Sequence, residues 1–133
     1  MKFPERLRIS WWALRIALGV VPIVAGIDKY FNRLAEWGMY LSPYATKVVP
    51  VSTGTFMHIV GAIEIVAGLI VLSRWTKFGG YLVMIWLIGI AVNLLTTGMF
   101  YDIAVRDLEI AVGAFVLAQL SAVRQEYGRT AEI

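Results

Sequence analysis

The stretch Tyr81-Leu82-Val83-Met84-Ile85-Trp86-Leu87-Ile88-Gly89-Ile90 would be apolar on every side of a helix. A helix on the surface of a soluble protein needs a polar face toward water, so we expect this stretch to lie in lipid. It is part of one of four apolar stretches, each near the length of about 20 residues that spans about 30 Å of hydrocarbon. The four predicted spans are residues 11–27, 55–72, 78–95 and 103–122.

The composition favours the same class of protein. The chain has 133 residues, of which 59% are hydrophobic and 16% charged, and its mean hydropathy is +0.74. Soluble domains carry about 25% charged residues, so a soluble four-helix bundle is disfavoured. A cleaved signal peptide is also disfavoured, because Arg15 interrupts the first apolar stretch and no small-x-small cleavage motif follows. We therefore predict an all-α integral membrane four-helix bundle, a single transmembrane domain over residues 1–133.

Several classes of function and cofactor are excluded by residue counts. The chain has no cysteine and one histidine, which excludes thiolate clusters, disulfides and multi-histidine metal or haem sites within one chain. A net charge of +3 suits anionic headgroups, but no basic run interleaved with aromatic residues indicates nucleic acid. We predict no catalytic residue, no metal and no covalent cofactor, with a quinone or a lipid as the possible ligand.

The positive charges beside the spans predict the orientation. Arginines and lysines favour the cytoplasmic side, and the two sides differ by seven to three in their number. The seven are Lys2, Arg6, Arg8, Arg74, Lys77, Arg124 and Arg129, and the three are Lys29, Arg33 and Lys47. We therefore predict that the amino and carboxyl termini are both cytoplasmic.

The connection between the first two spans, residues 28–54, is too long for a simple turn. Apolar residues recur in it at helical spacing, which predicts a short interfacial helix lying on the membrane. These residues are Tyr30, Phe31, Leu34, Trp37 and Leu41. We expect Ser42-Pro43 to end this helix and Pro50 to limit helix before the second span. A lid over a cavity is the functional alternative.

Each span carries small or polar residues three or four positions apart, on one face. We expect these four faces to meet, because small residues let helices approach and ionisable residues avoid lipid. They are Arg15, Gly19, Pro22 and Gly26; Met57, Gly61, Glu64 and Gly68; Trp86, Gly89, Asn93 and Thr97; and Asp102, Arg106, Glu109 and Gly113. The glycines Gly19, Gly26, Gly61, Gly68, Gly89 and Gly113 are assigned to helix packing.

The charges within the spans should be paired, because each unpaired one costs at least about 2.5–3.5 kcal/mol. Glu64 lies near the middle of its span, and we expect Arg15 to reach it. Arg15 could instead extend to the lipid headgroups. Arg106 has Asp102 four residues before it and Glu109 three after it, which favours a salt-bridge network on one face. This network is either purely structural or, with Glu64 and His58, the lining of a ligand or proton site.

Two segments of the first span resemble the opening helix of DoxX-like membrane proteins. They are Leu14-Arg15-Ile16-Ala17-Leu18-Gly19 and Ala25-Gly26-Ile27-Asp28-Lys29-Tyr30-Phe31. Glu64, Arg106-Asp107-Leu108 and the four-span plan are also similar to that family, whereas Pro22 replaces its usual bulky apolar residue. The resemblance implies a small protein of the bacterial inner membrane. It also implies shared structural or functional roles for Arg15, Lys29, Glu64, Arg106 and Asp107.

Some DoxX-like proteins are similar to a subunit of thiosulfate:quinone oxidoreductase, and others associate with membrane redox complexes. We therefore expect a membrane-embedded accessory subunit of a larger, redox-linked bacterial complex, with lipid and other membrane subunits as partners. The alternative is a quinone-handling or solute-binding bundle. The candidate ligand-lining residues are Arg15, His58, Glu64, Asn93, Arg106, Asp107 and Glu109.

Overall fold

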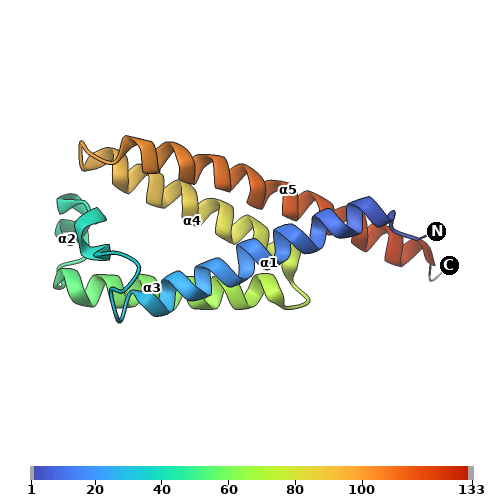
Figure 1. Ribbon diagram of the computed structural model, residues 1–133, viewed down its shortest axis with the longest axis horizontal. Coiled ribbons are helices and arrows are strands. Elements are labelled where there is room, and N and C mark those ends of the chain that lie inside the picture. The colour runs from blue at the N-terminus through green and yellow to red at the C-terminus, as the bar shows by residue number, and fades with distance from the viewer. Residues whose placement is uncertain (1, 132–133) are drawn as a thin grey trace.

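The computed structural model describes residues 2–131, and all regular structure among them is helical (Figure 1). The elements are α1 (Glu5–Asp28), the 3-10 helix η1 (Trp37–Tyr40), α2 (Pro43–Val48), α3 (Thr53–Leu72), α4 (Thr76–Thr96) and α5 (Tyr101–Ala131). The all-α prediction is confirmed.

Among the described residues, three helices, α1, α3 and α4, are long and apolar enough to cross a membrane. They contain the first three predicted spans. The ends of α3 and α4 lie within about two residues of the ends predicted for the second and third spans. The fourth predicted span, residues 103–122, lies within α5, whose 31 residues extend for about 46 Å at 1.5 Å per residue. A fourth crossing stays a prediction.

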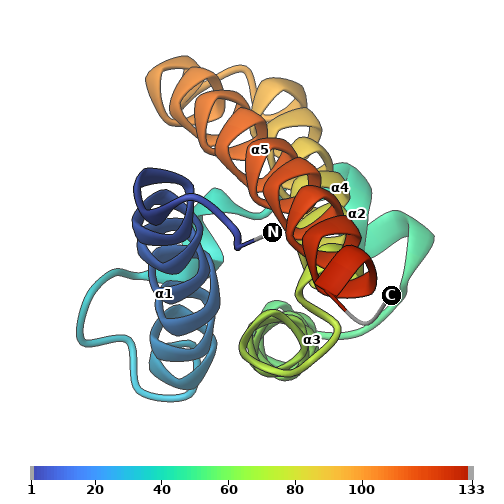
Figure 2. The same cartoon turned by 90° about the vertical axis from the view of Figure 1, so that its right-hand side faces the viewer.

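The four long helices form two antiparallel hairpins, α1 with α3 and α4 with α5 (Figure 1). The hairpins meet near the end of the molecule that carries both termini, where the Trp11 indole N–H donates to Ser121 Oγ at 2.8 Å. Figure 2 views the molecule from that end. Toward the other end the hairpins diverge, and the segment that contains η1 and α2 lies there.

Glycines hold α1 and α3 together. A Cβ atom added at Gly26 would lie 2.5 Å from the carbonyl oxygen of Gly61, and one added at Gly19 would lie 2.6 Å from the Leu72 side chain. A Cβ atom at Gly68 would collide with the carbonyl oxygen of Gly19. The backbones therefore touch at Gly19–Gly68 and Gly26–Gly61, and these two contacts set the register of the hairpin.

Gly89 and Gly113, which we expected in helix contacts, lie elsewhere. Gly89 is exposed, with open space where a side chain would be, and the nearest atom to a Cβ at Gly113 is 3.9 Å away. The packing role predicted for them is wrong. The contact between α4 and α5 instead uses Gly80, where a Cβ atom would lie about 3 Å from the backbone of Ala114 and Ala118.

The inward face of α5 also differs from the prediction. Asp102, Arg106 and Glu109 are exposed, and no ion pair joins them in the part of the chain that the structure describes. The predicted salt-bridge network is wrong. The buried face of α5 consists mainly of small residues three or four positions apart, namely Ala104, Asp107, Ala111, Ala114, Leu117, Ala118 and Ser121. Close packing against α4 selects this face, and the charges on the other faces stay outside.

The predicted interfacial helix across Tyr30 to Leu41 is wrong as well. A turn follows α1, and only the single 3-10 turn η1 forms within that stretch. Ser42 and Pro43 begin a helix instead of ending one: Ser42 Oγ accepts the Tyr44 N–H at 3.2 Å, and Pro43 is the first residue of α2. Serine at the N-cap and proline at the first helical position are the residues a helix start prefers.

Candidate functional site

A buried ion pair joins the carboxyl-terminal end of α1 to the middle of α3. Lys29, directly after α1, places its Nζ 2.9 Å from Glu64 Oε1 and 3.0 Å from Oε2. Only 5% of the Lys29 side chain and 7% of the Glu64 side chain are exposed. The Lys29 ammonium also lies 3.9 Å from the centroid of the Trp37 ring, a cation–π contact. The pair keeps two charges inside a largely apolar bundle.

Arg15 does not reach Glu64, so the expected pair between them is wrong. Its guanidinium donates to the carbonyl oxygens of Val71, Leu72 and Ser73, at 3.3, 2.5 and 3.1 Å. These carbonyls end α3 and lack partners within the helix, and a cation there is favoured by the helix dipole. The register of the hairpin places Arg15 opposite Leu72, about two turns from Glu64.

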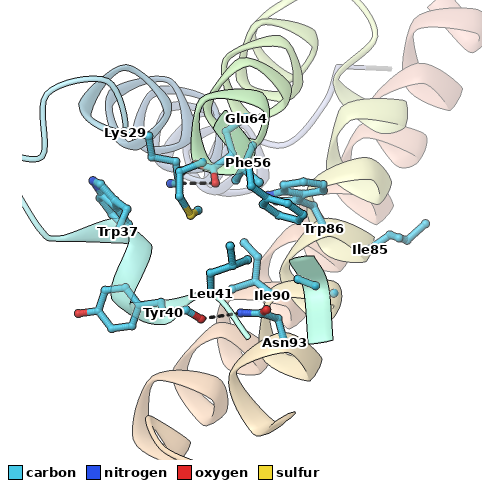
Figure 3. A pocket seen from close by; sticks show the side chains of 14 residues that line it. Lys29, Trp37, Tyr40, Leu41, Phe56, Glu64, Ile85, Trp86, Ile90 and Asn93 are labelled. Carbon is cyan, nitrogen blue, oxygen red and sulfur yellow. Dashed lines mark hydrogen bonds and ion pairs between the residues drawn. The ribbon is translucent and has the colours of Figure 1, made fainter. Parts of the chain in front are cut away.

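A cavity of about 480 Å³ opens beside the ion pair (Figure 3). It lies between α3, α4 and residues 37–45, and most of its lining is apolar. Trp37 and Trp86 face it from opposite sides, and Lys29 and Glu64 form one wall. We call this space the first cavity. The exposed Gly89 lines it.

Residues 37–48, which comprise η1 and α2, form a cover over the first cavity. At one end of the cover, Asp28 Oδ2 accepts the Trp37 indole N–H at 2.8 Å. Near the middle of the cover, Asn93 on α4 donates to the Tyr40 carbonyl at 2.8 Å and accepts the Ser42 N–H at 2.9 Å. The cover is therefore tied to α1 and to α4, as a lid over a cavity would be.

A second cavity of about 560 Å³ lies between the two hairpins. Residues of α1, α3, α4 and α5 line it, and Lys29, Glu64, Trp86 and Ile90 belong to both cavities. Asp107 of α5, which is only 9% exposed, lines the second cavity. Arg106 lies at its margin, with an exposed side chain. The ion pair and Trp86 thus stand between the two spaces.

The buried indole N–H of Trp86 is not fully hydrogen-bonded. Its Nε1 is buried near the Glu64 carboxylate, whose charge it helps to stabilise, but it completes no hydrogen bond of normal geometry with any described residue. A buried N–H without a partner costs about 1–3 kcal/mol relative to a satisfied one. A ligand with an acceptor oxygen in either cavity would remove that cost.

The other predicted site residues lie apart from the cavities. His58 is exposed, its ring stacks on Tyr30 at 4.5 Å, and its carbonyl accepts the Tyr30 hydroxyl at 2.7 Å. Glu109 is exposed on α5. Neither lines a cavity, so the structure brings together Glu64, Lys29, Asn93, Asp107 and Arg106, but not His58, Glu109 or Arg15.

The family described as DoxX matches residues 10–96, well over half of the chain. The chain belongs to the DoxX family. No curated protein and no solved structure matches it. The match, together with three apolar helices, makes this a membrane protein.

The matched segment of this DoxX protein extends from α1 to the end of α4. It therefore contains Arg15, Lys29, Glu64 and Asn93, together with the cover and the whole of the first cavity's lining. Arg106 and Asp107 lie beyond it, in α5. The second cavity thus combines residues inside the matched segment with residues outside it.

Three residues of the site did not emerge from the residue patterns. Lys29 was singled out only by resemblance, although it continues the spacing of Gly19, Pro22 and Gly26 by three residues and so lies on the same face. The spacing of Trp37 predicts a helix face and not a contact with Asp28, because a hydrogen bond across nine residues of irregular chain has no periodicity.

Proposed function

We propose that this protein binds a quinone-type molecule in the first cavity. The observation that carries the proposal is the pairing of an apolar cavity with a buried donor, the Trp86 N–H, that completes no hydrogen bond with any described residue. Lys29 adds a positive charge to the wall of the same cavity. A quinone is an apolar ring and tail with carbonyl oxygens that accept hydrogen bonds. Its flat ring suits a space with indoles on two sides, because aromatic rings pack favourably against one another.

Binding of decylubiquinone to the protein in lipid nanodiscs tests this proposal, with empty nanodiscs subtracted. Trp86→Phe keeps an aromatic ring but removes the N–H, and we expect binding about threefold to tenfold weaker, as for a lost hydrogen bond of about 0.5–1.5 kcal/mol. Trp75→Phe is the matched control, because Trp75 is exposed and lines neither cavity.

A second variant fills the space directly. Gly89 has open space where a side chain would be, so Gly89→Leu should fold and occupy the first cavity. We expect it to reduce decylubiquinone binding at least tenfold. Equal binding by the wild type, Trp86→Phe and Gly89→Leu would contradict the proposal.

We also propose that the protein acts as an accessory subunit of a redox-linked complex in the bacterial inner membrane. The chain has no cysteine and one histidine, so a bound quinone would exchange electrons with groups on another subunit. We propose no catalytic step of its own. The excess of arginine and lysine on one side supports cytoplasmic termini.

Native mass spectrometry after gentle solubilisation tests the accessory role. We expect the 14.8 kDa chain to be released from a larger assembly that contains other membrane subunits. A chain that is always found alone, or only with copies of itself, would contradict the accessory role and leave quinone binding to be decided by its own experiment.

A further inference from the structure

The second cavity has a buried carboxylate, Asp107, that no described residue pairs at close range. Asp107 is about nine-tenths buried and lines this cavity, yet it makes no hydrogen bond and no ion pair with any described residue. Lys29, the only buried cation among the described residues, is held by both oxygens of Glu64. The second cavity is therefore lined by two buried carboxylates, by the Lys29 ammonium bound to Glu64, and by the exposed Arg106.

Arg106 does not supply the missing charge at close range. Successive residues on a helix point about 100° apart, so Arg106 and Asp107 face different directions although they are neighbours. Arg106 is exposed and acts on Asp107 only at longer range. On the far side of the cavity Glu64 is a second anion, which offsets part of the effect of Arg106 on Asp107.

The rest of the cavity is suited to an apolar body. Its walls are aliphatic side chains from α1, α3, α4 and α5, and Trp86 contributes an aromatic ring. An aromatic face attracts organic cations, most strongly when water is excluded. The volume of about 560 Å³ leaves room for a molecule much larger than an inorganic ion.

We infer that the second cavity is a binding site for a lipophilic organic cation, whose charged centre pairs with Asp107 and whose apolar groups lie against the walls between the hairpins. The site is separate from the quinone site proposed for the first cavity, although Lys29, Glu64, Trp86 and Ile90 border both.

Binding of radiolabelled tetraphenylphosphonium tests the inference. The full chain is placed in nanodiscs of phosphatidylcholine, because anionic lipids would themselves collect the cation. We expect saturable binding above that of empty nanodiscs, and Asp107→Asn should weaken it at least tenfold, since the charge pair is lost while the shape is kept. Asp102→Asn, at an exposed aspartate on the same helix, should bind within twofold of the wild type.

Two further variants separate the cavities. Ala25 lines only the second cavity, so Ala25→Leu should weaken cation binding at least tenfold while Asp107 stays intact; Gly89→Leu should leave it unchanged. Decylubiquinone binding should be unchanged in Ala25→Leu and weakened in Gly89→Leu. No saturable cation binding by the wild type, or equal binding by Asp107→Asn and Asp102→Asn, would overturn the inference. If Asp107→Asn fails to fold, unchanged binding by Ala25→Leu would overturn it.

Discussion

In the α1–α3 hairpin the buried carboxylate of Glu64 meets an ammonium at 2.9 Å, whereas in the α4–α5 hairpin the buried carboxylate of Asp107 meets no cation at that range. The backbones of the first hairpin touch at glycines, and this close approach brings Lys29 to Glu64. The second hairpin packs through alanines and leaves its charge facing a cavity. The Glu64 carboxylate is therefore part of an ion pair between helices, whereas the Asp107 carboxylate faces a cavity without a close partner.

Removing the cation of the paired site should have the largest effect. Lys29→Met leaves Glu64 buried without a partner, and we expect the free energy of unfolding to fall by about 3–5 kcal/mol. Unfolding in detergent, followed by circular dichroism, measures the change. Lys47→Met is the matched control, since Lys47 is exposed on α2, and should change stability by less than about 0.5 kcal/mol. A loss no greater than the control's would mean that the ion pair does not stabilise the fold.

Separating the backbones of the first hairpin should cost somewhat less. Gly68→Ala introduces a Cβ atom against the carbonyl oxygen of Gly19, so α1 and α3 must move apart. We expect a loss of about 2 kcal/mol in the same unfolding measurement. Gly89→Ala should be neutral or stabilise by up to about 1 kcal/mol, because alanine favours helix and nothing lies in its way. Equal effects at the two glycines would show that the seam is not tightly packed.

The fold was largely predictable because lipid imposes a simple demand on helices. The ends of α3 and α4 lie within a few residues of the predicted spans, since an all-round apolar stretch has no alternative to a buried or lipid-facing helix. The connection after α1 was not predictable in the same way. Its aromatic spacing favoured a helix, but Asp28 accepts the N–H groups of Arg33 and Leu34, which holds a turn there instead.

The candidate site was predictable only in part, because the inward faces of the helices were predicted from their charged residues and not from the small residues that pack closely. The glycine register alone places Arg15 opposite Leu72 and excludes a pair with Glu64. In α5 the alanines at 3- and 4-residue spacing mark the buried face more reliably than the charges do, and Asp107 lies on that face. The cavities themselves depend on how the hairpins diverge, which no residue pattern encodes.

The cover links the two hairpins, and loosening it should have a moderate effect. Asn93→Ala removes the hydrogen bonds to the Tyr40 carbonyl and the Ser42 N–H, for which we expect a loss of about 1–2 kcal/mol. Hydrogen exchange of the Ser42 amide should become about 5-fold to 30-fold faster, which is the change in rate that this loss of free energy corresponds to. The exposed Val92→Ala on α4 is the control. Unchanged exchange would mean that Asn93 does not hold the cover.

The smallest expected effect is also the one that distinguishes the two carboxylates most directly. Asp107→Asn replaces an unpaired buried charge by a neutral group of the same shape, and we expect stability to rise by about 1 kcal/mol. Glu64→Gln, the same chemical change in the paired site, should lower stability because it leaves the Lys29 ammonium without its carboxylate. Opposite signs in the two variants would show that one carboxylate is structural and the other is not. If Asp107→Asn also lowered stability, Asp107 would have a stabilising partner within the chain, and a cation site there would lose its physical basis.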